Sequence, residues 1–180
     1  VQPTGGEISI DGMKMENNHA ELLSEIGAMI EYPAFYGNLT GRQNLKLEFE
    51  SARLTDKEWL QRLIQMFDME GYIDQPVKQY SLGMKQRLGL CRAMLRKPHY
   101  IILDEPTNGL DVEGTLWFWW AVHTLHEELK ATVLVSGHSI SELEKEMNHF
   151  LFLKKGEMAG FFHKEDLKDI YLCKTKASLK

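Results

Sequence analysis

Apolar and polar positions along this chain fall into patterns that separate strands from helices. Four short apolar runs predict strands, and they occupy residues 26–30, 100–103, 132–136 and 150–153. The run at 100–103 is expected to be a strand buried on both faces. Near the start, Gly6 to Gly12 alternates apolar and polar residues and ends on the turn pair Asp11-Gly12, which predicts a further strand. Because helical segments separate the strands, we expect an α/β fold with a mainly parallel sheet and right-handed crossovers.

Helical patterns dominate residues 41–98. Two pairs of residues three apart are capping-box signatures that predict helix starts, namely Thr40 with Gln43 and Thr55 with Glu58. The second of these helices carries an apolar stripe at helical spacing and is expected to stop near Gly71. Ser81 predicts the N-cap of another helix that runs to about Arg96.

The chain is expected to form one domain made of several parts. Residues 1–40 and 99–163 form the α/β core, and residues 41–98 form a helical subdomain inserted between strands. Further helices are expected at 18–25 and 112–130. The last part, residues 164–180, is expected to be a short helix over 164–172 followed by a frayed tail.

Polar residues follow three of the predicted strands. Asp104 and Glu105 come directly after the strand at 100–103, Glu31 follows the first strand, and His138 comes shortly after the strand at 132–136. In open α/β sheets, ligands bind beyond the carboxyl ends of the strands. There Asp104 could reach a cation through hard oxygen ligands, and Glu105 could orient a water or take its proton. For the acidic residues taken alone, the structural alternative of an ordinary polar turn is about as common. A lone histidine is usually structural or merely exposed, and His138 gains weight because it repeats the strand-end position of Asp104 and Glu31.

The helix that begins at Ser81 offers a second candidate site. Free N–H groups at a helix N-terminus, together with the helix dipole, favour an anion, and Gly83 permits close approach of a ligand to the backbone. An ordinary capped helix is the commoner explanation of such a segment. The pattern therefore indicates an anion site only in combination with the strand-end residues.

Composition narrows the classes of function. A net charge of −5 over 180 residues argues against a general nucleic-acid binder, although it does not exclude a local basic patch. Cys91 and Cys173 lack the spacing of a zinc site or a disulfide framework, which favours a reduced, cytoplasmic setting. The apolar run at 116–122 is far shorter than the roughly 20 residues that a membrane-spanning helix needs.

Three motifs, taken in order, strongly resemble the ATPase subunit of ATP-binding cassette (ABC) transporters. They are Ser81-Leu82-Gly83-Met84-Lys85-Gln86-Arg87-Leu88, Ile102-Leu103-Asp104-Glu105-Pro106-Thr107-Asn108-Gly109-Leu110-Asp111 and Ser136-Gly137-His138. The resemblance extends from Gly5 to about Phe162. It implies a P-loop NTPase-like (RecA-like) core with a parallel sheet and a helical subdomain.

The resemblance also implies roles for single residues. Asp104 matches the Walker B aspartate that acts on Mg²⁺, and Glu105 matches the residue that polarises the attacking water. His138 matches the switch histidine near the γ-phosphate, and Asp111 matches the D-loop aspartate that works across a dimer. The signature loop, residues 80–84, would contact ATP bound to the opposite subunit through Ser81 and Gly83, although Leu82 and Met84 replace the common Gly and Gln.

Glu31 stands where the family has its Q-loop glutamine, which touches Mg²⁺ and relays coupling to the membrane subunit. Together with Ser-Leu-Gly-Met-Lys, this glutamate resembles the branch that exports peptide antibiotics such as bacitracin and lantibiotics, or gives immunity to them. The implied ligands are ATP and Mg²⁺. The implied partners are a second ATPase subunit in a head-to-tail dimer and a transmembrane permease that holds the protein at the cytoplasmic face of the membrane, with no nucleic acid.

One departure from the family pattern is large. The phosphate-binding loop G-x-x-x-x-G-K-[ST], known as Walker A, is absent, and in the family it lies before the segment that matches residues 3–12. We therefore expect that the sequence is truncated at its N-terminus and that this polypeptide alone binds ATP weakly, with negligible turnover. We also expect exposed apolar surface beside the strand at 132–136, and a tendency to associate.

Two other classes of function stay open. A soluble member of the same superfamily could act on nucleic acid, although it would usually carry tandem cassettes or long coiled-coil insertions. A non-catalytic regulatory or interaction fragment would explain the absent phosphate loop. The reading frame upstream of Val1 separates this last class from a transporter subunit, and a neighbouring gene with about six apolar spans separates the transporter from the soluble ATPase.

Overall fold

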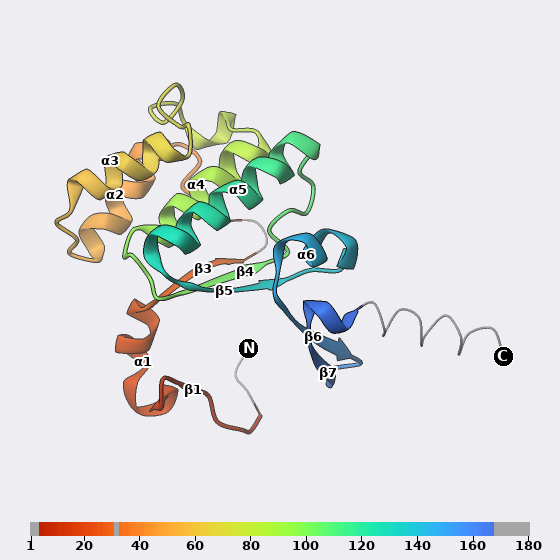
Figure 1. Cartoon of the computed structure of the whole chain (residues 1–180). Coiled ribbons are helices and arrows are strands. Elements are labelled where there is room, and N and C mark those ends of the chain that lie inside the picture. The colour runs from red at the N-terminus through yellow and green to blue at the C-terminus, as the bar shows by residue number, and fades with distance from the viewer. Residues whose placement is uncertain (1–3, 31–32, 168–180) are drawn as a thin grey trace. The chain divides into compact units, whose positions relative to one another are not determined.

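Three parallel strands form the central sheet of the protein. They are β3 (Ile26–Ile30), β4 (Tyr100–Asp104) and β5 (Thr132–Ser136), in the spatial order β3-β4-β5 (Figure 1). Their register places Ile30 beside Asp104 and Asp104 beside Ser136, so the carboxyl ends of all three strands are level. The predicted α/β fold with a parallel sheet is confirmed.

The computed structural model describes residues 4–30 and 33–167, in two compact units that divide between Ser136 and Gly137. The first unit contains the sheet and its helices. None of the helices in the described ranges combines the length and the apolar character needed to cross a bilayer.

Helices α4 (Leu82–Met94) and α5 (Val112–Leu129) cover one face of the sheet (Figure 1). Helix α4 approaches β3 closely at Gly27, because a Cβ at this position would collide with the Ala93 carbonyl oxygen. The core between these layers consists of fully buried apolar side chains, including Leu88, Met94, Leu103, Phe118 and Leu125.

The opposite face of the sheet is much less covered. Leu134 is 60% exposed and Ile30 is 67% exposed, although both lie in strands with buried neighbours. Ile102, which pairs with Leu134 in the sheet register, is only half-buried. The expectation that residues 100–103 form a strand buried on both faces is therefore wrong for this face.

The N-terminal strand signal corresponds to a small hairpin. It consists of β1 (Ser9–Ile10), β2 (Met13–Lys14) and a tight turn in which Asp11 and Gly12 both have positive φ, at 51° and 78°. Asp-Gly suits such a turn because both residues tolerate left-handed backbone. Helix α1 (Met15–Ser24) follows and leads into β3.

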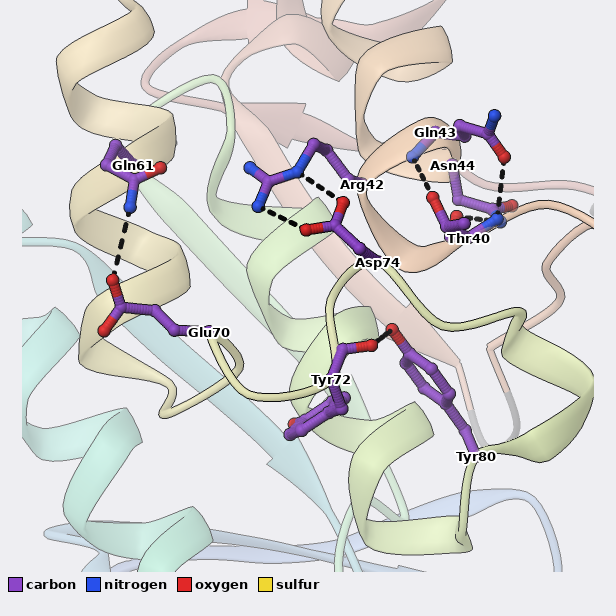
Figure 2. A network of polar contacts seen from close by, with 9 residues as sticks. All are labelled: Thr40, Arg42, Gln43, Asn44, Gln61, Glu70, Tyr72, Asp74 and Tyr80. Atoms are coloured by element: carbon purple, nitrogen blue, oxygen red, sulfur yellow. Dashed lines mark hydrogen bonds and ion pairs between the residues drawn. The ribbon is translucent and has the colours of Figure 1, made fainter.

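The helical region contains α2 (Gly41–Ser51), α3 (Lys57–Met66), the short 3-10 helix η1 (Val77–Gln79) and α4. The capping box at the start of α2 is confirmed, with the Gln43 N–H bonded to the Thr40 hydroxyl at 3.1 Å and the Thr40 N–H bonded to the Gln43 side chain at 2.9 Å (Figure 2).

The capping box predicted for α3 is wrong by one residue. Asp56 is the N-cap of this helix, and its carboxylate accepts the Trp59 N–H at 2.9 Å, which satisfies one of the free N–H groups of the first turn. The helix also ends before Gly71. Its C-cap is Phe67, and Asp68 then takes a φ of 51°, which turns the chain away from the helix without a glycine.

The second unit contains α6 (Ile140–Glu146), β6 (His149–Lys154), β7 (Glu157–His163) and the 3-10 helix η2 (Lys164–Asp166). Strands β6 and β7 form an antiparallel hairpin around a turn at Lys155 and Gly156. The strand predicted at 150–153 is confirmed, whereas β7 was not predicted. Of the helix expected over 164–172, the described residues form only the short 3-10 turn, and residues 168–172 lie outside the described part.

Candidate functional site

The carboxyl edge of the sheet holds a small polar network. The Ser136 hydroxyl donates a short hydrogen bond to the Asp104 carboxylate and accepts the Glu105 backbone N–H at 3.0 Å. Asp104 is exposed at the end of β4, and Glu105 is half-buried directly after it. Because Asp104 and Ser136 are register partners, the network follows from the parallel pairing of β4 with β5.

Glu105 adopts an unusual backbone conformation. Its φ is 44°, in the left-handed region that residues with a Cβ rarely occupy, and such conformations gather at functional sites. Two hydrogen bonds hold the loop that follows, from the Asn108 N–H to the Glu105 carbonyl and from the Leu110 N–H to the Thr107 carbonyl, each at 3.1 Å. The loop therefore fixes the backbone from which the Glu105 side chain projects.

A buried tyrosine positions the signature loop. Tyr80 is 5% exposed, its hydroxyl donates to the Tyr72 carbonyl at 3.0 Å, and the two rings pack edge to face with centroids 5.1 Å apart (Figure 2). Burial raises the pKa of Tyr80, so its hydroxyl stays a donor at neutral pH. The next residue, Ser81, is exposed and caps α4 by accepting the Met84 N–H at 3.3 Å, as predicted.

A forked ion pair ties this loop to α2. The Arg42 guanidinium donates to the two carboxylate oxygens of Asp74 at 2.7 and 3.0 Å (Figure 2). The hydrogen bond from Arg42 lowers the pKa of the Asp74 carboxyl. Because Asp74 lies between Tyr72 and Tyr80, this pair restrains the segment that leads into Ser81.

The start of α5 lies next to the start of α4. Asp111 caps α5 by accepting the Gly114 N–H at 2.7 Å, and a Cβ built on Gly83 would lie 3.9 Å from the Leu110 side chain. A cavity of about 360 Å³ opens between these helix starts. Its lining consists of residues from α4, from α5 and from the turn after α3, namely Asp68, Tyr72, Ser81, Gly83, Met84, Gln86, Arg87, Leu110, Asp111, Glu113, Gly114 and Trp117.

The structure thus places the sequence-predicted residues in distinct groups. Ser81, Gly83 and Asp111 line the cavity between α4 and α5, whereas Asp104 and Glu105 lie at the end of β4. His138 is exposed and belongs to the second unit. Glu31 directly follows the end of β3 but lies outside the described residues.

Sequence reasoning did not assign a role to Ser136. The available signal was a hydroxyl at the last position of a predicted strand beside the strand that ends in Asp104. The two hydrogen bonds of Ser136 depend on which strands pair and in which register, and local periodicity predicts neither.

The strand-end residues suit a hard cation such as Mg²⁺. This ion prefers oxygen ligands and usually keeps waters and substrate oxygens, with only one or two carboxylates from the protein. Asp104 offers an exposed carboxylate next to the Ser136 hydroxyl. Among residues 4–30 and 33–167, no three His, Cys, Asp or Glu side chains gather as a complete metal cage. The carboxylate of Asp104 and the hydroxyl of Ser136 are hard oxygen donors of the kind that Mg²⁺ accepts from a protein.

A family model places the chain among known proteins. The model described as ABC transporter matches residues 1–108, which is more than half of the 180 residues. This match covers the signature loop and the end of β4.

Two relatives share extensive sequence with the chain. The bacitracin transport ATP-binding protein BcrA of Bacillus licheniformis is 37% identical over 88% of the chain and 52% of its own length. The lantibiotic transport ATP-binding protein SrtF of Streptococcus pyogenes is 33% identical over 88% of the chain and 67% of its own length. The chain therefore spans about half of the first relative and two thirds of the second.

A solved structure shares the fold. The ATP-binding cassette MJ0796, a dimer in a post-hydrolysis state with ADP and Pi, superposes with a TM-score of 0.77 at 26% identity, covering 91% of the chain and 75% of MJ0796.

Proposed function

The chain belongs to the ABC transporter family, and from that premise we propose that it is the ATP-binding part of an exporter for a peptide antibiotic of the bacitracin or lantibiotic type. Full-length members of the family hydrolyse ATP. The names of BcrA and SrtF support the substrate class. The Asp104–Ser136–Glu105 network is the observation that carries the ATPase part of the proposal.

The geometry of Asp104 and of Glu105 supports a role for each of these two residues. The Asp104 carboxylate, held by the Ser136 hydroxyl, would ligate Mg²⁺, which supplies neutralising charge to the phosphates of bound ATP. Glu105 would accept a proton from the water that attacks the γ-phosphate, from a backbone fixed by the loop at 105–110. We assign His138 to the γ-phosphate and Glu31 to Mg²⁺ and to coupling with the membrane subunit, on the family resemblance alone.

The residues around the cavity would act on a second subunit. Ser81 is exposed at the start of α4, where free N–H groups favour an anion, and Gly83 permits close approach of a phosphate. We propose that Ser81 and Gly83 contact ATP bound to the opposite subunit of a head-to-tail dimer and that Asp111 works across the same interface. The dimeric state of MJ0796 supports this arrangement.

We further propose that the assembly includes a transmembrane permease that holds the ATPase at the cytoplasmic face of the membrane. Within the chain, residues 1–40 and 99–163 would form the nucleotide-binding core, and residues 41–98 would form the helical subdomain. The 180 residues contain no G-x-x-x-x-G-K-[ST] loop, so we expect this polypeptide alone to bind ATP weakly and to turn over negligibly.

Substitution of Glu105 in the full-length protein tests the ATPase assignment. Glu105→Gln removes the proton acceptor while it keeps size and hydrogen bonding, so we expect kcat to fall at least about 100-fold with ATP affinity retained. Glu127→Gln, an exposed change on α5, serves as the matched control and is expected to keep wild-type kcat. A Glu105→Gln enzyme with wild-type kcat would contradict the assignment.

The transport assignment is tested in cells. Co-expression of the full-length protein with its permease should raise the inhibitory concentration of bacitracin or of a lantibiotic, and Glu105→Gln should abolish this protection. An ATPase that is stimulated by RNA and that confers no protection would favour a soluble ATPase acting on nucleic acid. An intact protein that binds no ATP would favour a non-catalytic regulatory role.

A further inference from the structure

Arg87 joins three segments of the first unit. Its guanidinium lies 4.2 Å above the ring centroid of Trp117 on α5, and it donates to the Phe67 carbonyl at 3.0 Å. The same nitrogen lies 3.4 Å from the carboxylate of Asp68. Since the Asp68 side chain is 90% exposed, that ion pair is weak, and the stack and the carbonyl bond dominate.

Trp117 receives this contact from a fixed position. Its ring packs edge to face on Phe67, with centroids 5.7 Å apart, and Phe67 is fully buried. The adjacent aromatic residues of α5 are placed differently, because Phe118 is buried in the core and Trp120 is 52% exposed. Trp117 thus projects from α5 toward α4, and Arg87 projects from α4 toward α5.

The stack lies nearly two helical turns beyond the helix starts that carry Ser81 and Asp111. Arg87 follows Ser81 by six residues on α4, and Trp117 follows Asp111 by six residues on α5. Both belong to the wall of the 360 Å³ cavity that separates these helix starts. The helix starts also touch directly, because a Cβ on Gly109 would lie 2.9 Å from the Leu82 side chain. The Arg87–Trp117 stack adds a second contact between α4 and α5, at the wall of the cavity.

We propose that the Arg87–Trp117 stack is a positioning device that sets the spacing between the signature loop and the D-loop. The inference rests on the proposed function, because Ser81 and Asp111 matter together only if both meet ATP across a dimer. In this proposal Arg87 and Trp117 act through the two helices that they join, and neither is assigned a contact with the nucleotide. The alternative is that the stack contributes only to folding stability.

Steady-state ATP hydrolysis by the full-length protein separates the two explanations. Trp117→Leu removes the aromatic face but keeps apolar bulk, and we expect kcat to fall roughly ten-fold with KM for ATP changed less than about two-fold. Trp117→Phe keeps a face for the guanidinium and should restore kcat to within about three-fold of wild type. Trp120→Leu, on the exposed side of the same helix, is the matched control and should leave kcat unchanged.

Arg87→Lys tests the same positioning role from the other side of the stack. It serves as the main test if Trp117→Leu does not fold. Lysine keeps the charge but lacks the planar fork, so it cannot hold the Phe67 carbonyl while it stacks on the ring. We expect kcat to fall several-fold with KM little changed. In the double variant with Trp117→Phe, the two losses should be less than additive, because both changes weaken one contact.

Three outcomes would overturn the positioning role. They are a folded Trp117→Leu or Arg87→Lys enzyme with wild-type kcat, equal losses in Trp117→Leu and Trp120→Leu, and a loss in kcat that only follows a smaller folded fraction measured by calorimetry. A wild-type protein without ATPase activity would instead overturn the proposed function, and the inference with it. The wild-type control therefore distinguishes the two failures.

Discussion

At the scale of single residues, the Ser136 hydroxyl has two partners with different demands. The hydroxyl donates to the Asp104 carboxylate and fixes its orientation. It also accepts the Glu105 N–H, and this bond helps to hold the left-handed backbone of Glu105. One small side chain thus restrains both acidic residues of the strand end. Its loss should change the orientation of the acids rather than the fold, because it lies exposed at the end of a strand.

We predict that Ser136→Ala lowers kcat of the full-length ATPase roughly ten-fold, because Asp104 loses its donor and Glu105 loses its acceptor. Ser136→Thr keeps the hydroxyl and should recover most of the activity. The measurement is steady-state hydrolysis, with Ser51→Ala at the exposed end of α2 as the control. Equal kcat in Ser136→Ala and wild type would show that the Ser136 hydroxyl does not contribute to activity.

At the scale of elements, helix starts show what local sequence can and cannot specify. Asp56 rather than Thr55 caps α3, and its other carboxylate oxygen lies 2.8 Å from the Lys97 ammonium. A carboxylate at the N-cap satisfies a free backbone N–H and also complements the positive end of the helix dipole. The capping-box pattern of Thr55 with Glu58 was therefore outweighed by a stronger cap one residue later.

This difference yields a sharp test. Asp56→Ala should lower the free energy of unfolding by about 1 kcal/mol, whereas Thr55→Ala should change it by less than about 0.5 kcal/mol. Asp56→Asn separates the two roles of Asp56, because asparagine keeps the cap but loses the charge that faces Lys97. Urea unfolding followed by circular dichroism gives the three values. A larger loss of unfolding free energy for Thr55→Ala than for Asp56→Ala would indicate that Thr55, and not Asp56, caps α3.

The Arg42–Asp74 fork makes a second element-scale contribution that depends on pH. The fork lowers the pKa of folded Asp74, so it stabilises the fold fully above the unfolded value of about 3.9. The contribution is lost as pH falls through the lower folded pKa. It is small, because both side chains are largely exposed and screened by solvent.

We therefore predict that the contribution of the fork to thermal stability is constant from pH 7 to about pH 5 and declines below about pH 4. Asp74→Asn should lower stability at neutral pH and make the acid decline shallower. Calorimetry across this pH range measures both effects. An Asp74→Asn profile parallel to that of wild type would show that the fork does not contribute to acid sensitivity.

Much of the sheet and of the signature loop could be predicted because their signals are local. The strands at 26–30 and 132–136 and the cap at Ser81 were predicted to the residue, since apolar runs and capping hydroxyls are legible in short windows. Strand β7 was missed because Ala159 and Gly160 interrupt its apolar pattern at an irregularity in the hairpin register. The Ser136 bridge and the backbone of Glu105 could not be predicted, because they arise from strand register and from tertiary constraint.

At the scale of the whole molecule, the sparsely covered face of the sheet is the feature that most favours association with other chains. Ile30 and Leu134 are both more than half exposed, and β5 is an edge of the described three-stranded sheet. Edge strands and contiguous apolar surface favour pairing with other chains.

We predict that the 180-residue polypeptide associates in solution and binds a hydrophobic dye. Leu134→Gln should reduce both effects, because it places an amide on the exposed apolar face. Val112→Gln on α5 is the matched control, because Val112 is 78% exposed and lies away from that face. Light scattering after size exclusion measures the effect, and a stable monomer that leaves the dye dark would contradict the prediction.

The left-handed backbone of Glu105 lowers the stability of the fold at a residue to which we assign a role in ATP hydrolysis. A residue with a Cβ in that conformation costs roughly 1 kcal/mol that glycine does not incur. A laboratory selection for thermal stability alone would therefore favour Glu105→Gly. Under the role proposed for Glu105, the selected proteins would be more stable and would lack the proton acceptor for ATP hydrolysis. Engineering for stability therefore has to keep Glu105 in its left-handed conformation and place stabilising substitutions elsewhere in the chain.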